Sequence, residues 1–297
     1  MATTGTAEPT GTKPFSPFEW MIAGRYLRAR RRETFISIIS LFSFLGILLG
    51  VATLIVVMSV MNGFRTELIG KILGVNGHMI VQPIDTPFTD FADVASRIAM
   101  VKGVKSAIPF VEGQVLASGA STSNGALVRG IRAEDLPSVP GVASNIRQGT
   151  LKDFDTAGGV AIGTRLATAL GLTIGDKITL VSPRGAVTPM GVTPRVKAYP
   201  VTAIFEIGMS EYDSTFVFMP FAEAQLYFNQ DDKASAVEVY LDDPEMAGTL
   251  TPMIETAAGR PVLITDWRQR NMTFFSALEV ERNMMFMILT LIVLVAA

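Results

Sequence analysis

The sequence predicts an α+β membrane protein, with an N-terminal transmembrane helix, a mixed α/β domain outside the cytoplasm and the start of a second transmembrane helix. Three observations support this fold class. No residue between Glu33 and Arg65 carries a formal charge, 15 uncharged residues follow Arg282, and the stretch between these two segments alternates strand and helix patterns. Two apolar segments therefore flank one folded domain.

Composition narrows the possible functions. Hydrophobic residues make up 49% of the 297 residues and the mean hydropathy is +0.39, which is high for a soluble protein. The net charge of −2 gives no basis for binding nucleic acid. The sequence has no cysteine, no GxxxxGK[ST] phosphate loop and no GxGxxG fingerprint. We therefore expect a chain that is not an enzyme, has no ATPase motif of its own, and uses no metal and no cofactor.

The first apolar segment is longer than a membrane requires. It runs from Ile36 to about Met61, 26 residues, and as a helix this spans roughly 39 Å against a hydrocarbon core of about 30 Å. The helix is therefore expected to cross the membrane and emerge, leading into FRTELIGKILG. A cleaved signal peptide would have a shorter apolar run and a small-residue cleavage site, so we expect the helix to be retained.

Five arginines between residues 25 and 32 set the expected orientation, because dense positive charge stays in the cytoplasm. The N-terminus is then cytoplasmic. We expect a disordered tail over 1–16, a cytoplasmic interfacial helix over 17–33, and transmembrane helix 1 with its extension over 34–64. An ordinary juxtamembrane flank is the alternative for 17–33.

The second apolar segment is short. Residues 269–297 are expected to form a stalk and a truncated transmembrane helix 2, because the uncharged run spans only about 22 Å as a helix. We therefore expect a fragment that lacks later transmembrane helices. In the first helix, Gly46 and Gly50 form a GxxxG spacing that permits close helix packing. Their partner is the second helix, a later helix or another subunit.

The connecting domain, residues 65–268, contains two β-α-β patterns. HMIVQP, a helix near TDFADVASRIA with Thr89 or Asp90 as its N-cap, and VKSAIPFVEGQVLAS form the first; ASAVEVYL, DPEMAGTLTPMIETAAG and RPVLITDW form the second. Together they predict a split ferredoxin-like sheet. We expect residues 65–118 and 233–268 to form a membrane-proximal lobe. Residues 119–232 are expected to form an inserted β-rich lobe with short helices at 164–170 and 220–228.

Residues 183–200, PRGAVTPMGVTPRVKAYP, form an arm between two predicted strands. The arm has four prolines, two glycines and the basic residues Arg184, Arg195 and Lys197, and no acidic residue. Proline stiffens such a connection, so an extended hairpin with Met190 near its tip is one interpretation. A flexible hairpin without a partner is the other, and composition alone does not separate them.

His78 is the single histidine and precedes the strand-like run in NGHMIVQP. Any catalytic triad or His-rich metal site would have to use it. One hydrogen bond satisfies a neutral imidazole, so we expect a partly buried structural histidine.

Four stretches resemble one known family, the permease subunits of the bacterial lipoprotein-releasing ABC transporter (the LolC/LolE type). They are RYLRARRRETFISIISLFSFLGILLGVATLIVVMSVMNGFRTEL, ILGVNGH, TPMGVTPR and ALEVERNMMFMILTLIVLVAA. The arm resembles that of the C-type subunit. The resemblance implies a bacterial inner-membrane permease with a periplasmic domain between its first two helices. It also implies a cytoplasmic ATPase subunit, a second permease subunit, lipoprotein acyl chains as cargo, and a periplasmic lipoprotein carrier.

The resemblance also assigns residues. It places Thr188, Pro189 and Met190 at the tip of a carrier-binding hook, with Pro194 at its return, Lys197 on an adjoining basic pad and Arg195 nearby. Val187 and Thr179 depart from the C-type pattern, where an aromatic residue and an arginine are expected. The chain therefore resembles a C-type subunit without excluding an E-type or dual-role one.

On the first helix, the resemblance places Val57, Val60 and Met61 along the lipid-acyl cavity, and Phe64 lies one turn beyond them. The alternative is a structural stalk with Val60 and Met61 packed against the second helix. Two further alternatives concern the whole chain. One is an ABC permease for efflux or envelope remodelling, which should lack the TPMG arm. The other is a two-helix sensor, which should continue into a cytoplasmic signalling coil.

Overall fold

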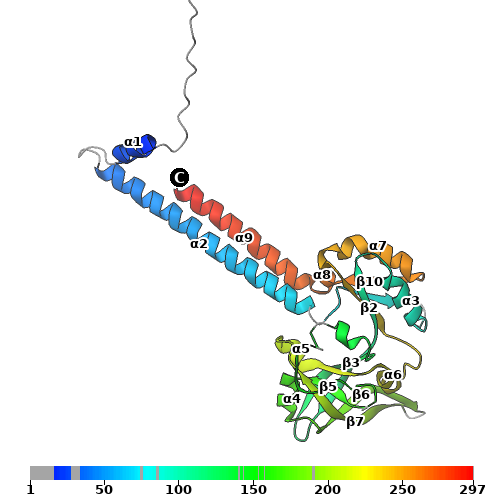
Figure 1. The fold of residues 1–297 in the computed structure, drawn as a ribbon. Coiled ribbons are helices and arrows are strands. Elements are labelled where there is room, and N and C mark those ends of the chain that lie inside the picture. The colour runs from blue at the N-terminus through cyan, green and yellow to red at the C-terminus, as the bar shows by residue number, and fades with distance from the viewer. Residues whose placement is uncertain are drawn as a thin grey trace, which may run out of the picture. The chain divides into compact units, whose positions relative to one another are not determined.

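The computed structural model describes residues 17–27, 34–73, 76–84, 87–139, 141–142, 144–152, 154–156, 158–188 and 191–296. The chain divides into two compact units (Figure 1), one of residues 1–62 with 277–297 and one of residues 63–276. The predicted tail, residues 1–16, lies outside the described residues. We describe each unit separately.

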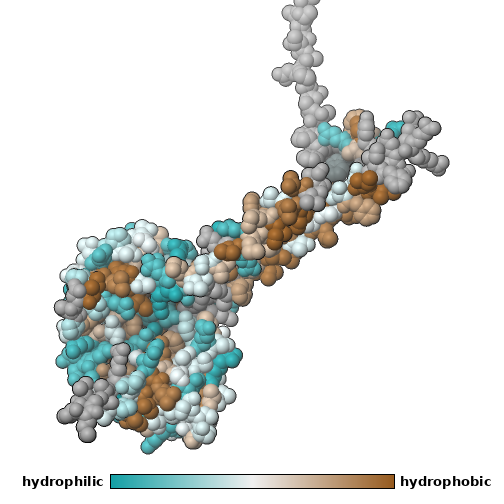
Figure 2. Space-filling model, turned by 180° about the vertical axis from the view of Figure 1, so that it is seen from behind, coloured by the Kyte–Doolittle hydropathy of each residue, from teal (hydrophilic) through white to brown (hydrophobic). Residues whose placement is uncertain are grey.

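The first unit is helical. Its elements are α1 (Pro17–Leu27), most of α2 (Thr34–Leu73) and most of α9 (Met272–Ala296). Helix α1 covers the first part of the predicted interfacial helix, and residues 28–33 lie outside the description. Figure 2 shows apolar side chains over the surface of this unit.

Helix α2 contains a segment long and apolar enough to cross a membrane. The segment is Ile38–Phe64, 27 residues with a mean hydropathy of 2.6. The helix then continues without a break to Leu73, so the prediction that it runs past its apolar segment is confirmed. Within the described part of the chain, no other helix meets the same criterion, since α9 carries Glu279, Glu281 and Arg282. A second membrane crossing therefore stays a prediction.

The second unit contains the predicted split ferredoxin-like sheet. Two β-α-β units supply its strands, which pair antiparallel in the order β10-β1-β9-β2 with α3 and α7 packed together. This is the arrangement expected of two interleaved β-α-β units in one sheet. The elements are β1 (Met79–Pro83), α3 (Phe91–Ala99), β2 (Val104–Ser118), β9 (Ala236–Leu241), α7 (Ala247–Ala258) and β10 (Val262–Asp266).

The apolar face of α3 explains why this segment forms a helix. Val94 and Ile98, four residues apart, are fully buried and anchor its apolar face. Beside this face, Arg97 donates to the carbonyls of Ala257 and Ala258 at 2.9 and 2.6 Å, placing a cation at the C-terminus of α7. Asp90 takes the N-cap position, but its carboxylate pairs with Arg260 instead of capping the helix, so the expected side-chain cap is absent.

The inserted segment and the second half of β2 form a closed ring of strands. The pairings β2–β3, β3–β8, β8–β5, β5–β7, β7–β6 and β6–β2 return to their starting strand, and β4 pairs with β7 outside the ring. The strands are β3 (Ser123–Ile131), β4 (Ile146–Gly149), β5 (Val160–Gly163), β6 (Lys177–Thr188), β7 (Gly191–Phe205) and β8 (Phe216–Pro220). Closing a ring leaves few unpaired edges, which suits an inserted lobe of short strands.

Short helices decorate this unit. The predicted helices at 164–170 and 220–228 are α4 (Thr164–Leu170) and α6 (Phe221–Phe228), and α4 ends at Gly171 with a φ of 66°. The helix predicted from Pro244 begins as the 3-10 turn η2 (Pro244–Met246) and continues as α7. Strand β4 and three short helices, η1 (Leu136–Ser138), α5 (Ser210–Thr215) and α8 (Trp267–Arg270), were not predicted.

A buried ion-pair network joins the two sheets. Strand β2 pairs with β9 up to Phe110 and with β3 from Val111 onward. Beside this change of partner, Arg129 on β3 lies between the rings of Phe110 and Phe216 and bonds Glu112 at 2.6 Å and Glu238 at 3.2 Å. Burial opposes the charge of Arg129, but the two carboxylates outweigh it and raise its pKa. The division into two lobes nevertheless remains a proposal.

Candidate functional site

The arm is a paired hairpin. Strands β6 and β7 pair antiparallel from Lys177↔Pro200 to Thr188↔Gly191, with an irregularity between Ser182 and Ala186. The prediction of an extended hairpin is confirmed for this backbone. Pro189 and Met190 lie outside the described residues, and Thr188 is described in its backbone alone.

Glycine is required at the irregularity. A Cβ atom on Gly185 would lie 1.8 Å from the carbonyl oxygen of Thr193 on the facing strand, a distance no side chain can adopt. Glycine at a bulge lets two backbones approach closely. The arm therefore carries a glycine at the position where its two paired strands require one.

Arg195 ties the arm to α6. Its guanidinium donates to the carbonyl of Leu226 and, at 3.1 Å, to that of Tyr227, while the Tyr227 hydroxyl donates back to the Arg195 carbonyl at 3.3 Å. These contacts place a cation at the C-terminal end of α6, where carbonyls lack intrahelical partners. Arg195, which was predicted to lie near the basic pad, therefore attaches the arm to α6.

Lys197 also points toward α6. Its Nζ lies 2.7 Å from Oε1 of Glu223 and 5.1 Å from the centroid of the Tyr199 ring, and the Tyr199 hydroxyl donates to the same carboxylate at 2.7 Å. Burial and this hydrogen bond raise the pKa of Tyr199. Glu223 thus offsets the charge of the predicted pad lysine.

The opposite face of the arm carries an apolar strip that sequence reasoning missed. Leu116 pairs with Val181, and Val181 pairs with Val196, so the three side chains form one row across β2, β6 and β7. Leu116 is 47% exposed and Val196 61% exposed. Pro194 is exposed and shares the parity of Val196 on β7, so it lies on this face as well. The alternation of side chains along β7 is visible in the sequence, but the sequence does not show which side of the strand packs against α6.

The predicted lipid-path residues share one helix face. Val57, Val60, Met61 and Phe64 follow an i, i+3, i+4, i+7 spacing on α2. Val60 is 66% exposed and Phe64 52% exposed, whereas Val57 and Met61 are partly covered. Among the described residues, Val60 is therefore largely uncovered by the second helix whereas Met61 is partly covered, so the structural-stalk alternative stays open.

The two glycines of α2 differ. A Cβ on Gly50 would lie 2.9 Å from Cγ2 of Ile292 on α9, whereas a Cβ on Gly46 would meet no atom within 4 Å. The second helix is thus the packing partner of Gly50. Gly46 has open space beside it.

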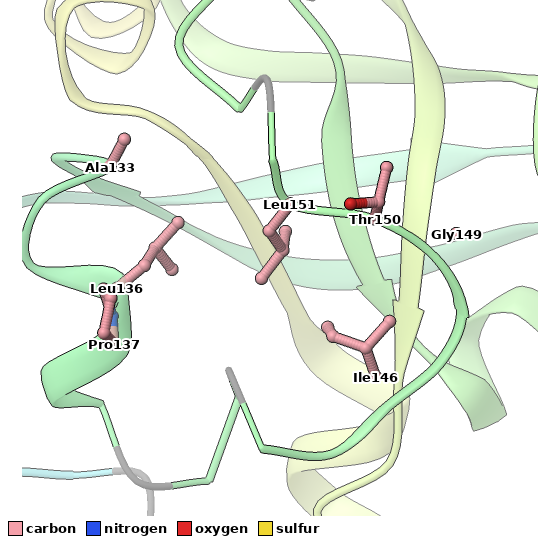
Figure 3. Close-up of a pocket in the computed structure, with 7 residues that line it drawn as sticks. All are labelled: Ala133, Leu136, Pro137, Ile146, Gly149, Thr150 and Leu151. Atoms are coloured by element: carbon pink, nitrogen blue, oxygen red, sulfur yellow. The ribbon is translucent and has the colours of Figure 1, made fainter.

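A cavity elsewhere in the second unit does not belong to the arm. It measures about 300 Å³ and is lined without any charged side chain by Ala133, Leu136, Pro137, Ile146, Gly149, Thr150 and Leu151 (Figure 3). Ile146 and Gly149 pair with Phe205 and Ala203, at the end of β7 opposite to the hairpin tip. The cavity and the arm are therefore separate features.

His78 has the structural role expected of it. It is buried, and its Nδ1 accepts a hydrogen bond of 2.9 Å from the backbone N–H of Leu241. Burial, followed by the charge of Lys105, lowers the pKa of the imidazole. Within the described residues no cluster of three or more His, Asp or Glu side chains could hold a metal ion.

Comparison with known proteins places the chain in a family. Residues 40–257 match the family described as the MacB-like periplasmic core domain. The lipoprotein-releasing system transmembrane protein LolC of Neisseria meningitidis is 37% identical over 289 residues, which cover 95% of this chain and 68% of that protein. The chain belongs to the LolC/LolE family. The resemblance drawn from its motifs is confirmed.

Relatives of both LolC/LolE subunit types match. The protein named LolE from Haemophilus influenzae is 27% identical over 286 residues, which cover 95% of this chain and 68% of that protein. Among solved structures, the periplasmic region of MacB from Actinobacillus actinomycetemcomitans is similar at 15% identity with a TM-score of 0.44, covering 68% of this chain and 95% of that one. The subunit type therefore stays open within the LolC/LolE family.

Proposed function

We propose that this chain is the permease subunit of an ABC transporter that extracts outer-membrane-destined lipoproteins from the inner membrane and passes them to a periplasmic carrier. The likeness to the Neisseria LolC protein along 95% of the chain carries the proposal. The long α2 helix and the paired arm supply the parts that such a role needs.

The apolar face of α2 gives the cargo a path. Each CH₂ of an acyl chain costs about 0.8 kcal/mol to expose to water, so a triacylated anchor requires apolar cover on leaving the bilayer. Val60 and Phe64 offer exposed apolar surface along α2, with Val57 and Met61 beside them. In this proposal acyl chains move along these four residues as they leave the membrane.

The arm is the proposed docking site for the carrier. Thr188, Pro189 and Met190 engage it at the tip, and the strip of Leu116, Val181 and Val196 extends the contact with apolar surface. Pro194 lies on the same face, while Arg195 and Lys197 hold the arm against α6. The proposal thus assigns recognition to one face of the hairpin and support to the other.

The remaining partners follow from the transport cycle. ATP hydrolysis takes place in a cytoplasmic ATPase subunit, and a second permease subunit, identical or paralogous, completes the membrane cavity. Closure of the ATPase moves the membrane helices and drives the lipid anchor toward the docked carrier. The N-terminus is cytoplasmic and the α/β unit periplasmic, as the arginine-rich flank of α2 favours.

Site-specific photocrosslinking tests the docking site. A photoreactive amino acid replaces Met190 in the full-length protein in native membranes, and a second probe replaces Asp232, which is exposed in the same unit. We expect an adduct between position 190 and a small soluble periplasmic protein, lost when Pro189 is replaced. An adduct with membrane subunits alone, or none above the Asp232 control, would contradict carrier docking on the arm.

A further inference from the structure

A narrow groove lies between α2 and α9 within the helical unit. It measures about 300 Å³ and is lined by Leu54, Met58, Arg282, Asn283, Phe286 and Leu289. The two helices lie side by side in Figure 1. Four of the six lining side chains are apolar, and the two polar ones are neighbours in sequence. None of the six belongs to the proposed cargo path on α2.

The groove has a closed end and a polar end. Ile292 packs against Gly50, one turn beyond Leu54 on α2 and one turn beyond Leu289 on α9. Residue numbers rise on one helix as they fall on the other, so the helices are antiparallel and this contact closes one end of the groove. Arg282 and Asn283 therefore lie at the other end, beside Met58.

The polar end lies at the expected depth of the outer lipid headgroups. The apolar segment of α2 begins at Ile38, and about 20 helical residues span the hydrocarbon core, so the core ends near Met58. The uncharged run of α9 begins directly after Arg282. Both helices therefore place the boundary between hydrocarbon and headgroups at the same end of the groove.

Charge indicates which headgroup fits. A guanidinium recognises phosphate by charge-assisted hydrogen bonds. Glu279 and Glu281 precede Arg282, so residues 279–282 carry two formal negative charges and one positive charge. The two carboxylates repel a lipid with net negative charge beside this segment. A headgroup that has both a phosphate and an ammonium group matches the mixed charges of these residues.

We propose that this groove binds one bilayer phospholipid with a zwitterionic amino headgroup. One acyl chain lies along Leu54, Met58, Phe286 and Leu289, and the phosphate accepts hydrogen bonds from Arg282. Water is a poor occupant of an apolar groove, and an acyl chain fills it at no cost in exposed hydrocarbon. This lipid is separate from the acylated cargo, which carries no phosphate at its anchor.

The test uses the full-length protein reconstituted in bilayers of defined composition, without lipoprotein. The probe is phosphatidylethanolamine with a photoreactive group on one acyl chain, and mass spectrometry locates the adducts. We expect labelling within residues 283–289. Leu54→Trp should reduce it several-fold by filling the groove, and Arg282→Gln should reduce it by removing the phosphate ligand.

Ile55→Trp is the matched control, since Ile55 is an isomer of Leu54 at the next position and is 59% exposed. It should leave the labelling unchanged. Equal loss in both tryptophan variants would overturn the proposal, as would equal or stronger labelling by phosphatidylglycerol carrying the same photoreactive group. Adducts of a photoreactive residue at Leu289 with another protein segment, in place of lipid, would show that a helix fills the groove.

Discussion

At the scale of single residues, the network around Arg129 is the least predictable feature of the chain. Glu112 and Arg129 lie more than 100 residues from Glu238 in sequence, and GALVRGIR reads as an ordinary short strand with two arginines, Arg129 and Arg132. The structure buries Arg129 between two aromatic rings, and Glu238 also accepts a hydrogen bond from the Gly77 backbone at 2.7 Å. These contacts depend on the closed sheet and not on a local pattern.

Replacing Arg129 should be severely destabilising. Arg129→Met leaves the buried carboxylate of Glu238 without its cation, and breaking a buried pair in this way costs about 3–5 kcal/mol. The free energy of unfolding, measured by denaturant titration, should fall by that order. The double variant Arg129→Met with Glu238→Gln should recover part of the loss, and equal stability of the single and double variants would contradict the role of the pair.

His78 should make stability depend on pH. Its folded pKa is lowered by burial below the usual value of 6.5, so the unfolded chain binds the proton first as pH falls. Stability is therefore complete above pH 6.5 and declines as pH falls below it. Denaturant titrations at pH 7.5 and 5.5 should show this loss in the unaltered protein. The loss should be smaller in His78→Asn, whose side-chain oxygen can still accept from Leu241.

At the scale of elements, hydrophobic periodicity predicted the strands of both β-α-β units and the helices α4 and α6. It failed for β4, where Ile146 is the single apolar residue in IRQG, and for α5, whose SEYDST has no apolar face. Strand β4 forms because it pairs with β7, and α5 forms because α4, β3 and β5 pack against it. Ring closure was unpredictable for a similar reason, since every ring pairing except the hairpins β2–β3 and β6–β7 joins segments that are distant in sequence.

The close contact at Gly50 predicts a difference between two similar variants. Gly50→Leu should force α2 and α9 apart, because its Cβ alone would lie 2.9 Å from Ile292. Gly46→Leu is the control, since that position has open space. Engineered-cysteine crosslinking between the two helices should weaken several-fold in the first variant and persist in the second. The reverse order would contradict the packing described here.

The apolar strip makes its own prediction for carrier binding. Val196→Asp places a charge in the row formed with Leu116 and Val181 and should weaken carrier binding about tenfold, as loss of a buried apolar contact typically does. Thr193→Asp is the matched control, because Thr193 is exposed on the same strand but has the opposite parity. Equal affinities of the two variants, by titration with the purified carrier, would count against the strip.

At the scale of the whole molecule, the chain's orientation can be tested by labelling, since it has no natural cysteine. Met100 is 83% exposed in the α/β unit and Phe18 is 63% exposed on α1. Met100→Cys should react with a membrane-impermeant maleimide in cells with a permeabilised outer membrane, whereas Phe18→Cys should react only after lysis. The opposite pattern would invert the proposed orientation.

The sequence thus led to the family, the long helix and the position of the arm. It did not reveal which face of the arm is open. Arg195 bonds the C-terminal carbonyls of α6, and Lys197 pairs with Glu223 of α6 while its side chain stays 52% exposed, whereas the residues of the other parity carry the exposed apolar row. A strand's alternation is visible in sequence, but the choice of its packed face depends on tertiary contacts.

The change of strand partners at Phe110 also shows where the inserted segment joins the ferredoxin-like sheet. Phe110 and Ala236 are direct cross-strand partners, so the inserted segment leaves and re-enters the ferredoxin-like sheet at adjacent points. A hairpin with two turn residues would be enough to join β2 to β9 there, so the inserted segment interrupts no other pairing of this sheet. Excising residues 111–235 would nevertheless uncover Ile108 and Tyr240 and leave Glu238 without Arg129. The inserted segment and the ferredoxin-like strands therefore depend on each other for a buried core.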